Sequence, residues 1–128
     1  MQLLALCILA LSGLWLVAVG AAMALRPAYC LQVLALTAST WRVNVTEQGL
    51  RLGAGVAMVV RAPLSKLPLL FDIAGWFIIV SSLVLLVLPL RWHAGYAIWW
   101  AARLPMSAVR AVAPLSVGAG LALIWAAV

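Results

Sequence analysis

Charged residues are scarce in this chain. Only ten of its 128 residues carry a charge (seven Arg, one Lys, one Asp and one Glu), whereas 69% are hydrophobic. An average soluble domain is about one quarter charged, and disordered segments have low hydrophobicity. The composition, with a mean hydropathy of +1.26, therefore excludes a soluble globular domain and a disordered chain. It predicts a single, all-α integral membrane domain over residues 1–128.

Residues that carry enzyme or metal chemistry are also few. The two cysteines, Cys7 and Cys30, form no CxxC motif, and no histidine lies near either of them. We therefore expect no disulfide, metal site or cofactor. The net charge of +6 is spread along the chain without a basic run, so it predicts contacts with membrane lipid headgroups and no nucleic-acid partner.

Four apolar segments are long enough to be considered as membrane spans. They are Leu3–Leu25, Thr46–Pro63, Leu67–Leu88 and about Ser107–Val128. A helix needs roughly 20 apolar residues to cross a bilayer core. The first segment resembles a signal peptide in its small residues near position 24 but lacks a positive leading region, so a retained helix is favoured.

The second segment is the weakest candidate span. Between Arg51 and Arg61 lie only nine uncharged residues, which separates the two arginines by about 15 Å along a helix axis. The segment spans the membrane if both arginines extend toward opposite headgroup layers. A short re-entrant or interfacial segment is the alternative.

The chain reads as a tandem duplication. Gly13 and Gly75 stand in similar contexts at an offset of 62, and residues 52–58 resemble residues 117–123 at an offset of 65. These offsets predict one repeat over about 1–63 and a second over about 64–128. With two spans in each copy, the repeats are parallel, and the fold is a four-helix bundle with amphipathic interfacial connector helices.

Each half resembles the YjeT-like family, small two-helix bacterial inner-membrane proteins of unknown function. The features that carry the resemblance are residues 20–27, residues 51–55 that open the second helix, and their counterparts Pro89 and 118–120. The second copy departs from the pattern because no arginine stands directly before its glycines. The resemblance implies a location in the bacterial inner membrane and carries no activity.

Positive charges are distributed unevenly between the two predicted sides. The connectors at 26–47 and 89–107, with the adjoining helix ends, hold six of the eight basic residues, and the 61–67 loop holds the other two. The positive-inside rule predicts cytoplasmic connectors and both termini outside.

The second connector is rich in aromatic residues. Trp92, Tyr96, Trp99 and Trp100 share one predicted helical face between two arginines. Trp and Tyr favour the membrane–water boundary, so we expect an interfacial helix that anchors the protein. Residues 31–41 form a weaker copy. Binding of a lipid or quinone headgroup by the aromatic cluster is the alternative.

A few ionisable side chains are candidate functional groups. Asp72, inside the third span, is expected to pair with Lys66 or Arg61; proton or cation binding is the alternative. Glu47 precedes Arg51 by four residues, which is the favourable order for an ion pair on a helix.

Two further residues bear on these groups. Arg110 is expected to compete with Arg51 for Glu47. His93 is interpreted as a solvated interfacial residue, with haem or chlorophyll ligation as the alternative.

Small residues recur every four positions along the second and fourth segments. They are Gly49, Gly53 and Ala57, then Ser116 with Gly120, and Gly118 with Ala122. Such stripes favour close packing of membrane helices.

Three functional classes remain. The favoured hypothesis is a non-enzymatic accessory or scaffold subunit of a membrane complex, either within a larger assembly or as a homo-oligomer. The second is a small transporter or ion-coupled permease that works through Asp72 and Arg61. The third is a membrane enzyme that uses His93 with Asp72, which the predicted topology places on opposite sides of the membrane.

Overall fold

The computed structural model describes residues 1–36 and 40–128, and their fold is all-α. Six α-helices and one 3₁₀ turn follow one another along the chain: α1 (Gln2–Leu25), α2 (Pro27–Ala35), α3 (Trp41–Arg61), η1 (Ala62–Leu64), α4 (Pro68–Val87), α5 (Leu90–Arg103) and α6 (Met106–Ala127). Helices α1, α4 and α6 agree with the predicted first, third and fourth segments to within a few residues. Residues 37–39 of the predicted interfacial copy at 31–41 lie outside the described residues.

Three of these helices are long and apolar enough to cross a membrane: α1, α4 and α6. Helix α3 has a similar length of 21 residues but does not belong to this group. Its first half is polar, because it carries Asn44, Glu47, Gln48 and Arg51. Helix α3 is therefore the weakest candidate membrane span among the four long helices in the structure, as it is in the sequence.

Prolines and one hydroxyl group set the helix boundaries. Pro27 and Pro68 begin α2 and α4, where a missing backbone N–H costs nothing, and Pro89 and Pro105 immediately precede α5 and α6. Thr40 caps α3, since its side-chain oxygen accepts a hydrogen bond of 3.2 Å from the Val43 amide.

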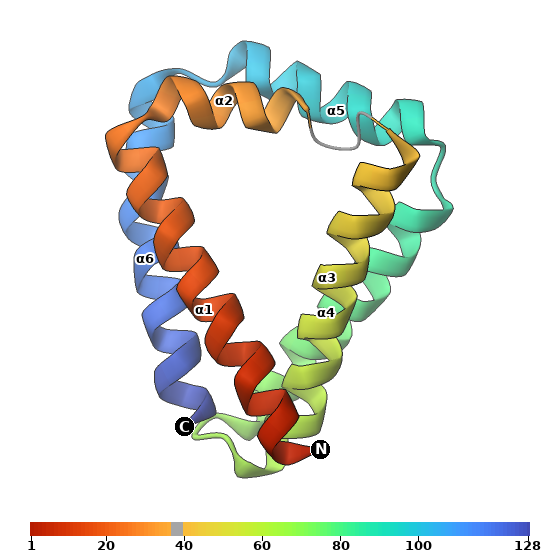
Figure 1. Ribbon diagram of the computed structural model, residues 1–128, viewed down its shortest axis with the longest axis vertical. Helices are drawn as coiled ribbons and strands as arrows, with labels where there is room; N and C mark the ends of the chain where they lie inside the picture. The colour runs from red at the N-terminus through yellow and green to blue at the C-terminus, as the bar shows by residue number, and fades with distance from the viewer. Residues whose placement is uncertain (37–39) are drawn as a thin grey trace.

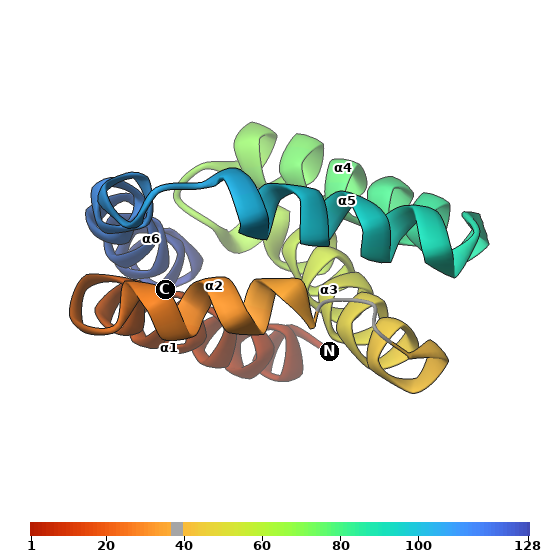
Figure 2. The same ribbon diagram turned by 90° about the horizontal axis from the view of Figure 1, so that it is seen from above.

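The four long helices form two antiparallel pairs. Helices α1 and α6 make one pair, the α1–α6 arm, and helices α3 and α4 make the other, the α3–α4 arm (Figure 1). The arms meet at the end that holds both termini, and at the other end α2 and α5 run side by side across the top of the molecule (Figures 1 and 2).

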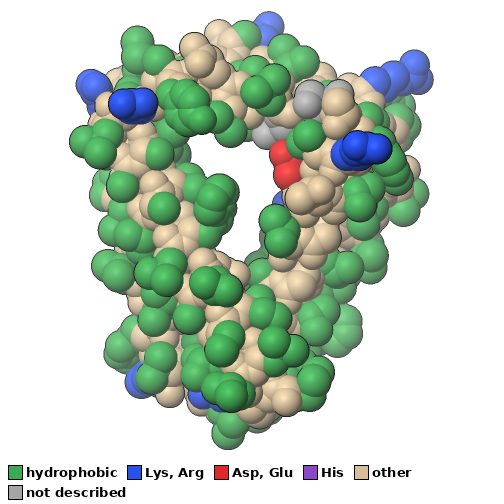
Figure 3. Space-filling view, in the orientation of Figure 1, with side chains coloured by type: hydrophobic (Ala, Val, Ile, Leu, Met, Phe, Trp, Pro, Cys, Tyr) green, Lys and Arg blue, Asp and Glu red, His purple; other side chains and the backbone are tan. Residues whose placement is uncertain are grey.

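The space-filling view shows an opening through the molecule, bounded by the two arms below α2 and α5 (Figure 3). The described helices thus form an open frame of two helix pairs, and the predicted four-helix bundle is not confirmed.

Each arm is held together by a pair of glycines at the helix crossing. A Cβ built on Gly13 would lie 2.5 Å from Ile124 Cγ1, and one built on Gly120 would overlap the carbonyl oxygen of Gly13. In the other arm, a Cβ on Gly75 would lie 2.9 Å from the carbonyl oxygen of Gly55. Glycine at both positions lets the two backbones approach closely, which strengthens dispersion contacts along the crossing.

The two crossings correspond residue by residue. Adding 62 to Gly13 gives Gly75, and adding 65 to Gly55 gives Gly120, so the two glycine pairs match each other. The neighbours match too: a Cβ on Gly13 meets Ile124, and a Cβ on Gly75 meets Val59, 65 residues earlier. The arms are therefore built in the same way, and each one joins a helix of the first half to a helix of the second.

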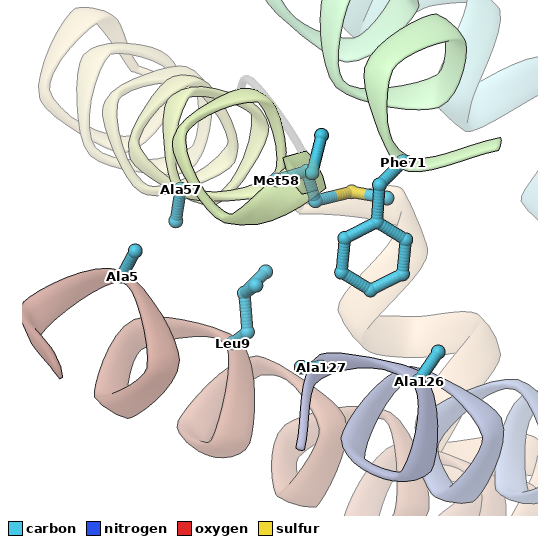
Figure 4. Close-up of a cluster of buried hydrophobic side chains, with 8 residues drawn as sticks. Ala5, Leu9, Ala57, Met58, Phe71, Ala126 and Ala127 are labelled. Carbon is cyan, nitrogen blue, oxygen red and sulfur yellow. The ribbon is translucent and has the colours of Figure 1, made fainter. Parts of the chain in front are cut away.

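A cluster of buried side chains joins the two arms near the termini. Its members come from all four long helices: Ala5 and Leu9 of α1, Ala57 and Met58 of α3, Phe71 of α4, and Ala126 and Ala127 of α6 (Figure 4). Small alanines let the helix ends converge around three larger side chains, Leu9, Met58 and Phe71, which are 0%, 8% and 2% exposed.

Only some residues of the predicted packing stripes make contacts within the described chain. A Cβ on Gly49, Gly53 or Gly118 would meet nothing within 4 Å, and Ala122 is exposed. Gly120 does pack at a crossing, and the hydroxyl of Ser116 donates a hydrogen bond to the Leu16 carbonyl. Ala57 is buried where the arms join.

Within the described residues nothing packs against Gly49 and Gly53, whereas Ala57 of the same stripe is buried. Gly55, two residues beyond Gly53, is turned by about 200° around the helix axis and lies at the contact with α4. Four-residue spacing alone could not distinguish the two faces.

We predict that Gly120→Ala destabilises the protein and that Gly118→Ala does not. The new methyl group at position 120 meets the Gly13 backbone, which cannot move aside as a flexible side chain can, so we expect a loss of about 1–3 kcal/mol. Thermal unfolding in detergent measures both variants. Equal melting temperatures for the two would show that the glycine crossing does not hold the arm together.

Candidate functional site

Arg61 and Lys66 lie at the end of the molecule that holds both termini, and both bind the C-terminal end of α6. Arg61 Nε donates to the Ala127 carbonyl at 2.9 Å, and Lys66 Nζ donates to the Trp125 carbonyl at 2.8 Å. Lys66 Nζ also lies 5.2 Å from the centre of the Trp125 ring. Cationic donors at a helix C-terminus satisfy its last carbonyls and oppose the helix dipole. This arrangement stabilises the junction between the arms.

Asp72 does not join these basic residues. It is exposed on α4, and its carboxylate forms no ion pair or hydrogen bond with any other described residue. The structure therefore does not bring together the predicted partners Asp72, Lys66 and Arg61. The carbonyls of α6 compete successfully because they lie directly beside the two basic side chains.

Polar residues gather at the opposite end of the α3–α4 arm. They are Asn44, Glu47, Gln48 and Arg51 of α3, Ser81 and Ser82 of α4, and His93 of α5, and we call them the polar seam. On α3 their spacing of three and four residues places them along one face. The seam links three elements at the end near the connectors.

Hydrogen bonds between side chains of different helices hold the polar seam together. His93 Nδ1 and Asn44 Oδ1 lie 3.0 Å apart and join α5 to α3. Arg51 Nη2 donates to Ser81 Oγ at 3.0 Å, and Ser81 Oγ donates to the Ile78 carbonyl at 3.1 Å. The interpretation of His93 as a solvated residue is thus replaced by a half-buried residue with a defined partner.

Three buried atoms of the polar seam have no hydrogen-bond partner among the described residues. They are Asn44 Nδ2, Gln48 Oε1 and Ser82 Oγ. The side chains of Asn44 and Ser82 are 0% exposed, and that of Gln48 is 3% exposed. Buried polar groups are nearly always paired, so three orphans in one place need an explanation. In the sequence, Asn44 stands in an Asn-Val-Thr glycosylation motif that we interpret as coincidence, and Gln48 and the two serines form no motif.

Of the other two predicted ionisable residues, Glu47 belongs to the polar seam and Arg110 lies in the other arm. Glu47 is half-buried on α3, one turn before Arg51. Arg110 is exposed on α6, which belongs to the other arm.

The predicted aromatic face is present on α5. Trp92, Tyr96, Trp99 and Trp100 are all exposed, between 38% and 65%. Trp100 packs edge-to-face against both Tyr96 and Trp99, with ring centres 6.1 and 5.0 Å apart. A shallow surface depression is lined by Gly95, Tyr96, Trp99 and Trp100.

An arginine lies against one of these rings. Arg103 stacks over the Trp99 ring at 4.2 Å. This combination of exposed rings and a stacked cation suits the boundary between lipid and water.

Comparisons with known proteins add nothing to these observations. No family model, curated protein or solved structure matches this chain. Within residues 1–36 and 40–128, no group of three or more His, Cys, Asp or Glu side chains could hold a metal ion.

We predict that substitution of Arg61 destabilises the protein and that substitution of Asp72 does not. Arg61→Met removes a charged donor from the Ala127 carbonyl and should cost about 1–3 kcal/mol. Asp72→Asn changes an exposed, unpaired carboxylate and should alter stability by less than about 0.5 kcal/mol. Chemical or thermal unfolding in detergent compares them. Strong destabilisation by Asp72→Asn would reveal an ion pair at this position.

Proposed function

We propose that this protein is a non-enzymatic, multi-pass protein of the bacterial inner membrane that serves as an accessory or scaffold subunit of a membrane complex. The observation that carries the proposal is the large apolar surface that the chain leaves uncovered. In the three helices that are apolar enough to cross a membrane, only 17–22% of the residues in the apolar window are buried. Lipid or the helices of a partner must cover the rest.

The ends of the molecule support a membrane orientation. Both termini and the turn at η1 lie at one end, and α2 and α5 lie at the other (Figure 1). We place α3 across the membrane beside α4, since the two pack along their lengths. The end with α2 and α5 faces the cytoplasm in this proposal, as the positive-inside rule predicts, and the aromatic face of α5 anchors it in the headgroup layer.

We also infer that the chain arose by duplication of a two-helix unit. The matching glycine pairs support it, because residues at offsets of 62 and 65 make equivalent contacts in the two arms. The two halves then form a pseudo-dimer of parallel repeats about an axis along the membrane normal. This inference agrees with the resemblance of each half to the YjeT-like two-helix proteins.

The open frame suits a scaffold better than a catalyst. His93 lies on α5 and Asp72 near the start of α4, at opposite ends of the arm, so they cannot act as one acid–base pair. The positions of Arg61 and Asp72 do not support the transporter hypothesis either, because Arg61 donates a hydrogen bond to the Ala127 carbonyl and Asp72 is exposed. A frame with apolar outer faces has the surface needed to hold other membrane helices.

We predict that a photo-crosslinking amino acid at Trp15 captures a partner in native membranes. Trp15 is 69% exposed in the middle of α1, whereas Leu9, on the same helix, is 0% exposed and serves as the matched control. Irradiation followed by purification in mild detergent and mass spectrometry should give a discrete protein adduct from position 15 only.

The nature of the adduct decides between the outcomes. A different protein supports a subunit of a larger complex, and a second copy of this chain supports a homo-oligomeric scaffold. Lipid adducts alone, together with a monomer that purifies without partners, would contradict the scaffold proposal.

A further inference from the structure

The α1–α6 arm shows what the fold requires, because it repeats the architecture of the α3–α4 arm. The offsets of 62 and 65 assign a counterpart to each member of the polar seam. The counterparts of Asn44, Gln48, Ser82 and His93 are Val109, Ala113, Gly20 and Leu31, and those of Glu47, Arg51 and Ser81 are Val112, Ser116 and Val19. Six of the seven counterparts are apolar.

The one polar counterpart has a structural role. Ser116 donates directly to the Leu16 carbonyl at 2.8 Å, and Arg51 reaches the matching Ile78 carbonyl through Ser81. The crossing therefore uses a polar side chain at this position in both arms. The rest of the polar seam is not needed for the crossing, since the α1–α6 arm is built without it.

The register places the orphaned atoms close to one level of the arm. Gly55 and Gly75 meet at the crossing, and seven residues further toward the connectors stand Gln48 on α3 and Ser82 on α4. In the other arm, the corresponding residues are in contact: a Cβ on Gly20 would lie 2.8 Å from the Ala113 carbonyl. Asn44 lies one helical turn beyond Gln48.

We propose that the polar seam is a hydrated site, in which water bridges Asn44 Nδ2, Gln48 Oε1 and Ser82 Oγ. The amide nitrogen can only donate, the amide oxygen can only accept, and the hydroxyl can do either. A bound group must therefore both accept and donate hydrogen bonds. A metal cation cannot accept from Asn44 Nδ2, and a fully ionised anion cannot donate to Gln48 Oε1. Water does both, and it is the usual partner of buried polar groups.

Water reaches this site from the connector end of the arm. Asn44 and Ser82 are fully enclosed, so a side chain has to move to admit water. Gln48 can do so, because it is unbranched and rotates about three side-chain bonds. Hydration also explains how Arg51 is accommodated within a membrane helix, where charged groups require water or a polar lining.

Solid-state NMR of the full chain in lipid bilayers tests the proposal directly. The sequence contains one asparagine and one histidine, so ¹⁵N labelling of Asn, His and Trp gives a single asparagine side-chain amide at Asn44 and a single imidazole at His93. Magnetisation transferred from water should reach Asn44 Nδ2 severalfold faster than the indole nitrogen of Trp15, which is lipid-facing in the proposed membrane orientation. Trp15→Phe identifies the indole signal.

A relocated asparagine is the matched control. In the double variant Asn44→Val, Val109→Asn, the amide occupies the corresponding place in the α1–α6 arm, where we expect transfer as slow as to Trp15. Equal transfer at positions 44 and 109 would show general water penetration and overturn the proposal. If the double variant does not fold, the comparison of Asn44 with Trp15 in the unaltered chain decides.

Three further results would also overturn the hydrated site, each for a different reason. Slow transfer from water to both Asn44 and Trp15 would refute hydration of the polar seam and leave the membrane location intact. Fast transfer from water to the Trp15 indole nitrogen would refute the membrane location on which this inference rests. A shift of the Asn44 amide signals when sodium replaces choline in the buffer, without transfer from water, would assign a cation site instead.

Discussion

The close approach of backbones at two glycine pairs is the constraint on which the rest of the structure depends. Gly13 with Gly120 and Gly55 with Gly75 bring two antiparallel helix pairs together. Apolar side chains give no hydrophobic driving force between helices that are surrounded by lipid, so packing at short distance has to supply the attraction. Once the two arms form, the buried cluster around Leu9 and Phe71 joins them at one end, and α2 with α5 joins them at the other.

This construction explains the open shape. Each arm contains one long helix from each half of the chain, so neither half closes on itself. Because the arms contact each other near the termini and are linked at the other end through α2 and α5, an opening remains between them (Figure 3). The carbonyls at the end of α6 are bound by Arg61 and Lys66, so the basic residues near the termini serve the joint between the arms.

Much of the fold could be predicted from the sequence because apolar length and proline position decide it. The boundaries of α1 and α4 follow from Pro27, Pro68 and Pro89, and the aromatic helix α5 follows from the spacing of its rings. The helix pairing could not be predicted, because the sequence does not show whether the face of α3 with Gly53 or the face with Gly55 lies against another helix. The polar seam was also missed apart from its charged members and His93, since single Asn, Gln and Ser residues acquire meaning only when the fold buries them together.

Reconstitution from two halves tests the central claim most directly. Residues 1–63 and 64–128, carrying different tags, would be produced together and purified through one tag. Both arms form between the halves, so they should co-purify in equal amounts, and Gly75→Ala combined with Gly120→Ala should abolish their association. Recovery of either half alone as a stable, folded helix pair would contradict this account of the structure.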